Sequence, residues 1–379
     1  MTASSYDVIV IGGGVIGAAV GWELAKRRHR VAIFDIGKAG KEASSAAAGM
    51  LGAQSEFSAP SPLVPLALQS RALMPSLAAE LKERTGMDIE LVEKGLIKAA
   101  TTEEEADDLR RHYAFWRERG EPVHWLTNEE VREIEPQLHA EALTGAMWIP
   151  GDGQVSAPNL AAALVSAAVS AGVHLYEYAE VLDIRSGGGG HLVDTAVGTF
   201  AAEAVVIASG AWAARLGAKA GLSLSMFPVK GECLMVRAHV PLLRTTVFAK
   251  NGCYIVPKAG NRLLIGATST PGTYDRRILA GGLARLLFQA AHLLPAVEQA
   301  EWVDAWSGIR PQTKDGLPYI GEHPERPGVF VAAGHYRNGI LLSAVTGAIV
   351  ADLVERKKPA FDLSPFALTR HAEETEGVK

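Results

Sequence analysis

The chain opens with an apolar segment typical of a buried parallel strand, followed by a glycine-rich turn and a helix. Residues 6–11 are mostly β-branched, as expected for a strand covered on both faces. Three glycines follow, and residues 18–27 carry apolar side chains at helical spacing. Residues 31–34 form a second apolar run that ends at Asp35. The pattern predicts a strand–turn–helix–strand unit.

Helical patterns continue through the first half of the chain. Residues 66–81 place leucines on one helical face, although Pro75 is expected to interrupt the helix. Thr102 and Thr127 are each followed three residues later by Glu, a capping-box pattern that predicts helices as far as about 119 and 136. Residues 158–171 are Ala-rich, begin with Pro and precede a Gly, which predicts a further helix.

Strand patterns dominate the middle of the chain, and alternation returns at the end. Strands are expected within 173–207, where 186–190 reads as a hairpin tip, and at 228–236, 245–249, 253–257, 263–268 and 328–332. Helices are expected at 276–294 and 338–356. This order predicts an α/β fold, with a Rossmann-type domain of discontinuous segments and a mainly antiparallel β-sheet domain inserted into it. The predicted limits are 1–86, 150–225 and 305–366 for the first domain, and 87–149 and 226–304 for the second.

Composition narrows the class of protein. The 379 residues are 48% apolar with a formal net charge of −5, which excludes a strongly basic nucleic-acid binder. The two cysteines are too few for a disulfide framework or a zinc site, and the histidines lack ligand spacing, so no metal site is expected. A reducing cytoplasmic compartment follows. The N-terminus has no basic signal region, and glycines and Glu23 interrupt the longest apolar stretch, so stable membrane insertion is not expected.

The first glycine turn predicts a dinucleotide site. Gly12, Gly14 and Gly17 match the G-x-G-x-x-G pattern between a strand and a helix, and Asp35 ends the next strand. The three glycines permit a tight turn, close approach of a pyrophosphate and close helix–strand packing. Asp35 suits the hydroxyls of an adenosine ribose. The motif alone leaves FAD and NAD open, although its position near the start of the chain favours FAD.

Six further motifs identify a family. They are SAAAGMLGA at 45–53, PVKGECL at 228–234, CYIVP at 253–257, GIRP at 308–311, KDG at 314–316 and GHYRNGILL at 334–342. With these motifs in this order, the chain resembles the D-amino-acid-oxidase-like FAD amine oxidases over almost its whole length. Within that family it is most similar to the glycine oxidases of thiamine biosynthesis.

The resemblance implies a non-covalent FAD and the oxidation by O2 of glycine, and also of sarcosine and small D-amino acids, with release of ammonia and H2O2. Arg310 would hold the substrate carboxylate, with Tyr254, Arg337 and Met50 nearby. No catalytic side chain is expected, because hydride passes directly to flavin N5. The implied FAD contacts are Gly12, Gly14, Val15, Ile16, Gly17, Asp35, Ile36, Ala43, Ser44, Ala48, Gly49, Met50, Val181, Gly210, His335, Tyr336, Arg337, Asn338, Gly339, Ile340 and Leu341. The family also implies a homo-oligomer, a tetramer.

Two positions depart from the glycine oxidase pattern. Ser269 stands where Met is expected and Gly252 where His is expected, and both are placed near the substrate pocket. These departures bear on the substrate range more than on the reaction. Three alternatives stay open: a D-amino acid or sarcosine oxidase of the same family, a quinone-linked amino acid dehydrogenase at the membrane, and a module that binds flavin without turnover. Cys233 and Cys253 are expected to be small buried hydrophobes.

Overall fold

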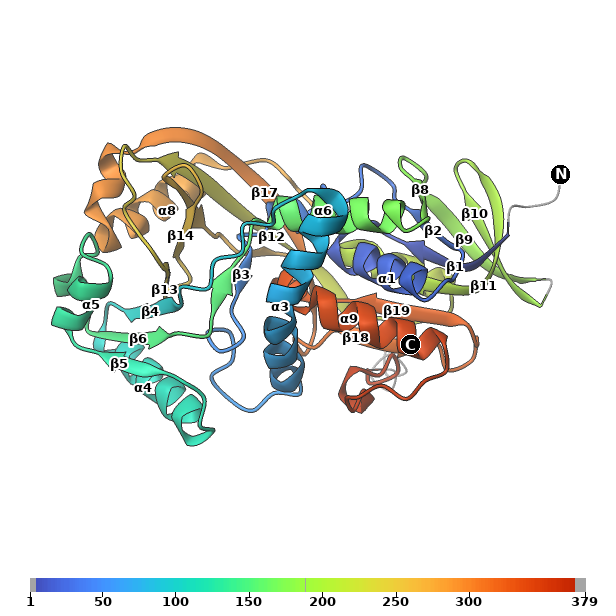
Figure 1. Cartoon of the computed structure of the whole chain (residues 1–379), viewed down its shortest axis with the longest axis horizontal. Coiled ribbons are helices and arrows are strands. Elements are labelled where there is room, and N and C mark those ends of the chain that lie inside the picture. Colours follow the sequence, from blue (N-terminus) through green and yellow to red (C-terminus); the bar gives the residue numbers. More distant parts are fainter. Residues whose placement is uncertain (1–4, 188, 372–379) are drawn as a thin grey trace.

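The computed structural model describes residues 5–187 and 189–371, which build two large β-sheets at opposite ends of an elongated molecule (Figure 1). The first sheet has eight strands. Its central path runs β18 (Tyr319–Glu322), β19 (Val329–Ala333), β11 (Gly198–Ile207), β1 (Ser5–Ile11), β2 (Val31–Phe34) and β8 (His174–Tyr176). From β19 to β8 all neighbours are parallel. The predicted Rossmann-type sheet is thus present.

The remaining two strands of this sheet form the predicted hairpin. β9 (Val181–Gly187) and β10 (Gly190–Thr195) pair antiparallel, and β10 also pairs with β11. Gly187 faces Gly190 across the hairpin. Gly188, which belongs to the predicted tip, lies outside the described residues.

Helices cover both faces of the first sheet because side chains alternate along its strands. Val8 and Val10 of β1 belong to a core shared with α1 (Val15–Lys26), α3 (Leu63–Thr85), α6 (Ala157–Ser170) and α9 (Gly339–Val354). Ile9 and Ile11 point to the other face, toward α7 (Ala213–Lys219) and the hairpin. In the described chain, Tyr336–Val354 alone is long and apolar enough to span a membrane, and 56% of its most apolar window is buried inside the protein.

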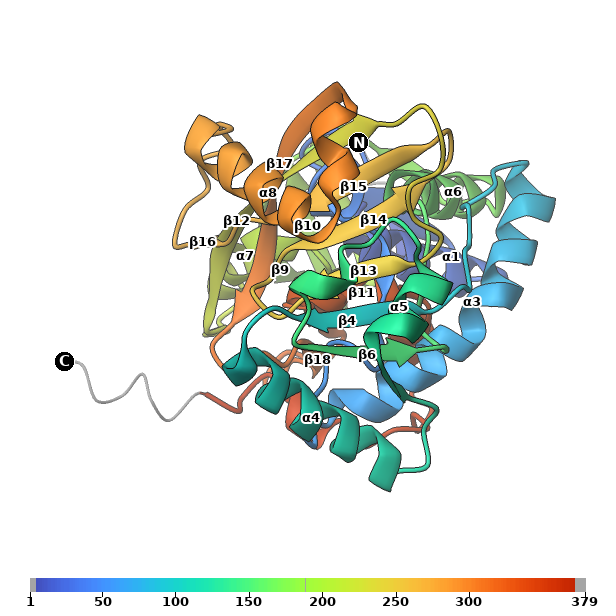
Figure 2. The ribbon, with the colours of Figure 1, turned by 90° about the vertical axis from the view of Figure 1, so that its left-hand side faces the viewer.

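The second sheet has nine strands and is mainly antiparallel, as predicted. Its path runs β16 (Thr270–Pro271), β12 (Met226–Arg237), β15 (Arg262–Gly266), β14 (Tyr254–Lys258), β13 (Thr246–Ala249), β4 (Leu96–Ala100), β6 (Gly145–Ile149) and β5 (His124–Leu126), and β17 (Glu301–Thr313) pairs with β12. Figure 2 shows this sheet with α8 (Ala280–Leu293) at one end of the view and α4 (Glu103–Glu118) at the other.

These two helices pack on opposite faces of the second sheet. Ile97 and Ala99 of β4 share a core with α8, whereas Leu96 and Ala100 share a core with α4. The α4 face is the one turned toward the candidate site described below, because Tyr254 and Cys233 belong to the same core.

Several elements differ from the sequence-based prediction. Pro75 does not interrupt α3, because the buried face of the helix, which includes Leu66 and Met74, packs over the sheet and offsets the missing hydrogen bond. The predicted helix from 276 begins at Ala280 instead, because the preceding residues follow an irregular path tied to β12. The long strand β17 was not anticipated at all.

The two capping patterns have different outcomes. At α5 (Asn128–Ile134) the predicted capping box is complete: Thr127 and Glu130 exchange both hydrogen bonds. At α4 the Thr102 hydroxyl accepts from the Glu105 amide, but the Glu105 carboxylate turns to the backbone and hydroxyl of Thr101. The predicted domain limit at 305 falls inside β17, which pairs with β12 from Glu301 to Thr313.

The contact between α1 and the end of β1 generates a stability prediction. A Cβ on Gly17 would lie 1.8 Å from the Gly12 carbonyl oxygen, so Gly17→Ala forces the helix away from the strand. We expect its free energy of unfolding to fall by at least about 1–3 kcal/mol. Gly281→Ala, in α8, is the matched control, because its Cβ would meet nothing within 4 Å. Urea unfolding of both variants measures the difference; an equal midpoint for the two would contradict the prediction.

Candidate functional site

A cavity of about 240 Å³ opens where the parallel strands of the first sheet end. The residues that follow β1, β2, β11 and β19 all line it, namely Gly12, Asp35, Ala208 and Gly334. The carboxyl ends of strands in an open α/β sheet are the usual place for a ligand.

The glycine turn lines this cavity and packs closely against the residues after β11. Gly12 has a φ of +104°, and a Cβ there would lie 2.6 Å from the Ala208 carbonyl oxygen. Gly14 is different: it is the N-cap of α1 with a φ of −70°, and a Cβ would meet only the Ser44 hydroxyl, at 3.1 Å. The first turn of α1 contains no acidic residue. The Val15 N–H donates to the Ser44 hydroxyl at 3.0 Å, and no acidic residue of the helix itself offsets its dipole, so this N-terminus favours an anion.

Asp35 lies beside this turn and is already partly engaged. Its two carboxylate oxygens accept the N–H groups of Gly13, at 2.7 Å, and Gly37, at 2.8 Å. A carboxylate has about four lone-pair sites. Acceptor capacity therefore remains for a pair of ribose hydroxyls.

One buried polar atom in the cavity has no protein partner. The hydroxyl of Ser209 is fully covered and forms no hydrogen bond to any described residue. Buried hydroxyls are almost always satisfied. An open anion site, an acidic residue with spare acceptors and an unpaired hydroxyl in one cavity fit the phosphates and sugar of a dinucleotide.

A second cavity, of about 80 Å³, adjoins the first and lies between the two sheets. The two cavities share residues of the 43–47 segment and of the 336–340 segment. The four side chains predicted to hold the substrate, Met50, Tyr254, Arg310 and Arg337, all line this second cavity.

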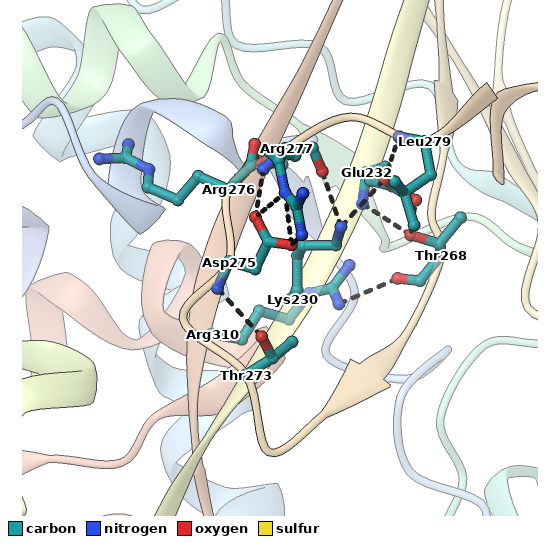
Figure 3. Close-up of polar contacts among 10 residues, drawn as sticks. Lys230, Glu232, Thr268, Thr273, Asp275, Arg276, Arg277, Leu279 and Arg310 are labelled. Carbon is teal, nitrogen blue, oxygen red and sulfur yellow. Dashed lines mark hydrogen bonds and ion pairs between the residues drawn. The ribbon is translucent and has the colours of Figure 1, made fainter.

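Arg310 extends from β17 across its neighbour strand. Its guanidinium covers Gly231 of β12, where a Cβ would lie 2.3 Å from Nη2. Its Nη1 donates a hydrogen bond of 3.2 Å to the Thr268 carbonyl (Figure 3). Among the described residues, no carboxylate lies within ion-pair distance of Arg310. A charged group in a cavity without a carboxylate partner is poised to bind an anion.

Tyr254 and Cys233 form a neutral wall of the same cavity. The phenol oxygen lies 3.5 Å from the thiol sulfur. Burial raises the pKa of the Tyr254 phenol and of the Cys233 thiol, so both stay protonated near neutrality. Cys233 is buried as expected, but it also lines the cavity. Cys253 is buried among the side chains on the opposite face.

Glu56 is the cavity residue that sequence reasoning missed. It forms two parallel hydrogen bonds of 2.9 Å with Arg337. Burial works against ionisation of Glu56, but the charge and hydrogen bonds of Arg337 outweigh it, and the pKa of the carboxyl is lowered. Glu56 lies three residues beyond the 45–53 motif, and no spacing or periodicity in the sequence points to it.

A buried network holds the segment that carries Glu56. Lys98 donates to the Ser55 carbonyl, and Asp152 accepts the N–H groups of Gln54 and Ser55. Burial lowers the pKa of Lys98 to about 8, while the Glu56 charge opposes that change. Side chains of β4 and of the residues after β6 thus hold the 54–56 segment in place.

Most residues predicted to contact the cofactor line the first cavity. These are Gly12, Gly14, Val15, Ile16, Asp35, Ile36, Ala43, Ser44, Val181, Gly210, His335, Tyr336, Arg337, Gly339 and Ile340. Four others line the second cavity: Ala48, Gly49, Met50 and Asn338. Gly17 and Leu341 line neither cavity; Gly17 packs against Gly12, and Leu341 is buried in the helical core.

The His335 imidazole contacts the Thr346 hydroxyl at 3.1 Å, and burial lowers its pKa to about 3, so it is neutral. Gly252 and Ser269, expected near the substrate pocket, line neither cavity. Gly252 is in the turn between β13 and β14 with a φ of +92°, and the exposed Ser269 only follows Thr268, which contacts Arg310.

Comparison with known proteins agrees with this geometry. The family model described as FAD dependent oxidoreductase (DAO) matches residues 7–353. The chain is 78% identical over 366 residues to the glycine oxidase of Geobacillus kaustophilus, covering 97% of each chain. The crystal structure of glycine oxidase from Geobacillus kaustophilus superposes with a TM-score of 0.96 at 77% identity, covering 97% of this chain and 99% of that one.

A further relative is a longer protein, and this chain matches about half of its length. The bifunctional protein ThiO/ThiG of Synechocystis sp. is 34% identical over 361 residues, which cover 94% of this chain and 52% of that protein. The family model and the glycine oxidase match each span most of the chain, including the segments that line both cavities. The chain therefore belongs to the DAO family of FAD-dependent oxidoreductases.

Proposed function

We propose that this protein is a glycine oxidase. In the overall reaction one glycine, one O2 and one water give one glyoxylate, one ammonia and one H2O2. Sarcosine and small D-amino acids are further substrates. The 78% identity to a glycine oxidase over 97% of the chain supports this assignment, and the second cavity supplies the chemistry for it.

The observation that carries the proposal is the guanidinium of Arg310, which lines the second cavity and has no carboxylate partner among the described residues. The amino acid carboxylate binds there in a two-point contact, since a planar guanidinium matches a carboxylate. Tyr254 and Met50 line the remaining space, and the cavity is only about 80 Å³ in volume. A substrate with no side chain, or a very small one, fits this space best.

The protein's own residues position the substrate and exclude water. Bound FAD supplies the acceptor for the hydride and its electrons pass to O2. Among the described residues of the second cavity, Glu56 is held by Arg337, and the thiol of Cys233 and the phenol of Tyr254 stay protonated. No side chain there is placed as a base for the Cα proton, which supports direct hydride transfer from a carboxylate-anchored substrate.

The cofactor contacts predicted from the sequence belong to the proposal too. The glycine turn and the N-terminus of α1 would hold the pyrophosphate, and Asp35 would hold the ribose; the segment before α9 lines the same cavity and would contact the flavin. We expect FAD to be bound non-covalently; no cysteine follows Arg310 in the sequence, so a cysteinyl link there is excluded.

The ThiO/ThiG relative contains a second part besides the one matched here, which supports a role in supplying thiamine thiazole synthesis. We propose a cytoplasmic homo-oligomer, a tetramer by family resemblance, that does not insert into membranes or bind nucleic acid. Its FAD-binding domain comprises 1–86, 150–225 and 305–366 and its substrate domain 87–149 and 226–304, with β17 crossing the limit at 305.

The assignment predicts a substrate order. With purified yellow protein and no added acceptor, H2O2 formation is expected to be fast with glycine and sarcosine, slower with D-alanine and D-proline, and slowest with large D-amino acids, because the cavity is small. A preference for D-phenylalanine would exclude glycine oxidase. Turnover only with an added quinone would favour the amino acid dehydrogenase, and a flavin that glycine fails to bleach anaerobically would favour a non-catalytic flavin module.

Arg310→Leu tests the carboxylate contact. Losing one partner of a buried charge pair costs roughly 2–5 kcal/mol, so kcat/KM for glycine should fall about 30- to 4,000-fold. FAD content should stay normal, and Arg310→Lys should recover only part of the activity. Arg237→Leu is the control, since Arg237 is an exposed residue at the far end of β12. Near-normal kcat/KM in a yellow Arg310→Leu protein would remove Arg310 from the site.

Gly14→Val tests the cofactor site without disturbing the fold. The φ of Gly14 suits any L-residue, and a Cβ would approach only the Ser44 hydroxyl. The branched side chain instead fills the space that the pyrophosphate needs. We expect folded but colourless protein, checked by circular dichroism and by the flavin absorbance. Full FAD occupancy would show that the pyrophosphate binds elsewhere.

A further inference from the structure

A buried ion pair lies on the side of the second sheet away from the substrate cavity, directly behind Arg310. Lys230 and Glu232 are both on β12, each with 3% of its side chain exposed, and Nζ lies 3.2 Å from Oε1. Gly231, between them, faces the opposite way, because side chains alternate along a strand. The Arg310 guanidinium covers Gly231. The ion pair itself does not line the second cavity.

The pair fastens both ends of the segment 268–279. Glu232 accepts the Thr268 hydroxyl at 2.9 Å through Oε2 and the Leu279 amide at 2.8 Å through Oε1. Lys230 donates to the Arg277 carbonyl at 2.7 Å. Figure 3 shows these contacts converging on the two side chains while Arg310 reaches the same segment.

Thr268 lies beside Glu232 of β12. Its hydroxyl is bonded on one face of the sheet and its carbonyl on the other. Its amide donates to the Glu232 carbonyl at 3.1 Å, and its hydroxyl accepts from the Glu232 amide at 2.9 Å. Together with the carboxylate contact, three hydrogen bonds join Thr268 to the single residue Glu232. Its carbonyl points to the cavity side, where it accepts the 3.2 Å bond from Arg310 Nη1.

We infer that Thr268 is a positioning residue for substrate binding: held by Glu232 and Lys230, its carbonyl orients the Arg310 guanidinium for the substrate carboxylate. The inference rests on the proposed function, and it names the part of the protein that sets the direction of the carboxylate contact.

The chemistry of the guanidinium explains why such an orienting contact matters. Arg310 has a long side chain, and the Thr268 carbonyl is its one hydrogen-bond partner among the described residues. A carboxylate in that position would compete with the substrate for the charge, whereas a neutral carbonyl takes one N–H and leaves the others free. A two-point contact is sensitive to the plane of the guanidinium, so a rotated guanidinium keeps its charge but loses one of the two hydrogen bonds to the carboxylate.

Thr268→Val removes the hydroxyl with little change in shape. The carbonyl remains, but two of the three bonds that hold it are lost. Thr268→Ser keeps the hydroxyl and serves as the conservative variant. Thr273→Val is the matched control, because Thr273 lies in the same segment and, within the described part of the chain, its hydroxyl accepts a hydrogen bond only from the Asp275 amide. If the valine variant fails to retain FAD, Thr268→Ala replaces it, since its smaller side chain admits a water molecule beside Glu232.

The measurement is the dissociation constant of acetate, a minimal carboxylate, followed by perturbation of the flavin absorbance of each holoenzyme. Acetate binding reports the carboxylate contact without turnover. For Thr268→Val we expect acetate binding to weaken about tenfold and the KM for glycine to rise by a similar factor. Its kcat should stay within about twofold of the value for the unmodified protein. Thr268→Ser and Thr273→Val should bind acetate like the unmodified protein.

The outcomes separate this inference from the proposed function. Unmodified protein that does not oxidise glycine overturns the proposed function, whatever the variants do with acetate. If the unmodified protein oxidises glycine but Thr268→Val binds acetate as tightly as Thr273→Val, the positioning role is overturned and the ion pair serves only the fold. Equal losses in Thr268→Ser and Thr268→Val overturn it as well, because the hydroxyl would then not be the deciding group.

Discussion

The antiparallel ladder between β12 and β17 is the constraint on which the candidate site depends. The two strands pair over almost their whole lengths, from Met226 with Thr313 to Arg237 with Glu301. Register in such a ladder cannot slip by one residue without turning every side chain to the other face. The ladder thus fixes Arg310 opposite Val229 and within reach of Gly231. The backbone hydrogen bonds between β12 and β17 therefore determine where Arg310 lies in the cavity between the sheets.

Electrostatics in the second cavity follow from unequal pairing. Arg337 is matched to Glu56, and Lys98 lies near the same carboxylate in a buried environment. Arg310 has only a neutral carbonyl as its partner in the described chain. Of the two guanidinium groups that line the cavity, that of Arg310 is therefore left for a ligand, and a small anionic group would complete the pairing. The pattern gives affinity for a carboxylate without a pocket shaped around a large side chain.

Local patterns in the sequence predicted most of the first sheet and the first cavity. The glycine turn and Asp35 are contiguous signals, and the strands that carry them were found within a residue or two. Residues 301–313 were missed because β17 has no clear period: its exposed and half-buried positions mix Trp, Asp and Gly. Arg310 was identified only through a family motif. Glu56 and Thr268 had no signal, because their partners are 281 and 36 residues away.

The place of α9 in the first core has a consequence for synthesis. This helix begins at Gly339, yet it packs against α1 and α3, which are made at the beginning of the chain. β19, which extends the sheet beside β11, also comes late. While the ribosome is still extending the middle of the chain, the apolar faces of β1 and α1 have no final cover. Contacts between segments so far apart in the sequence form slowly, and the intermediates expose apolar surface that promotes aggregation. We expect the nascent chain to need chaperones more than a protein of local contacts would, and a chain released before residue 339 to aggregate rather than to form a smaller folded domain.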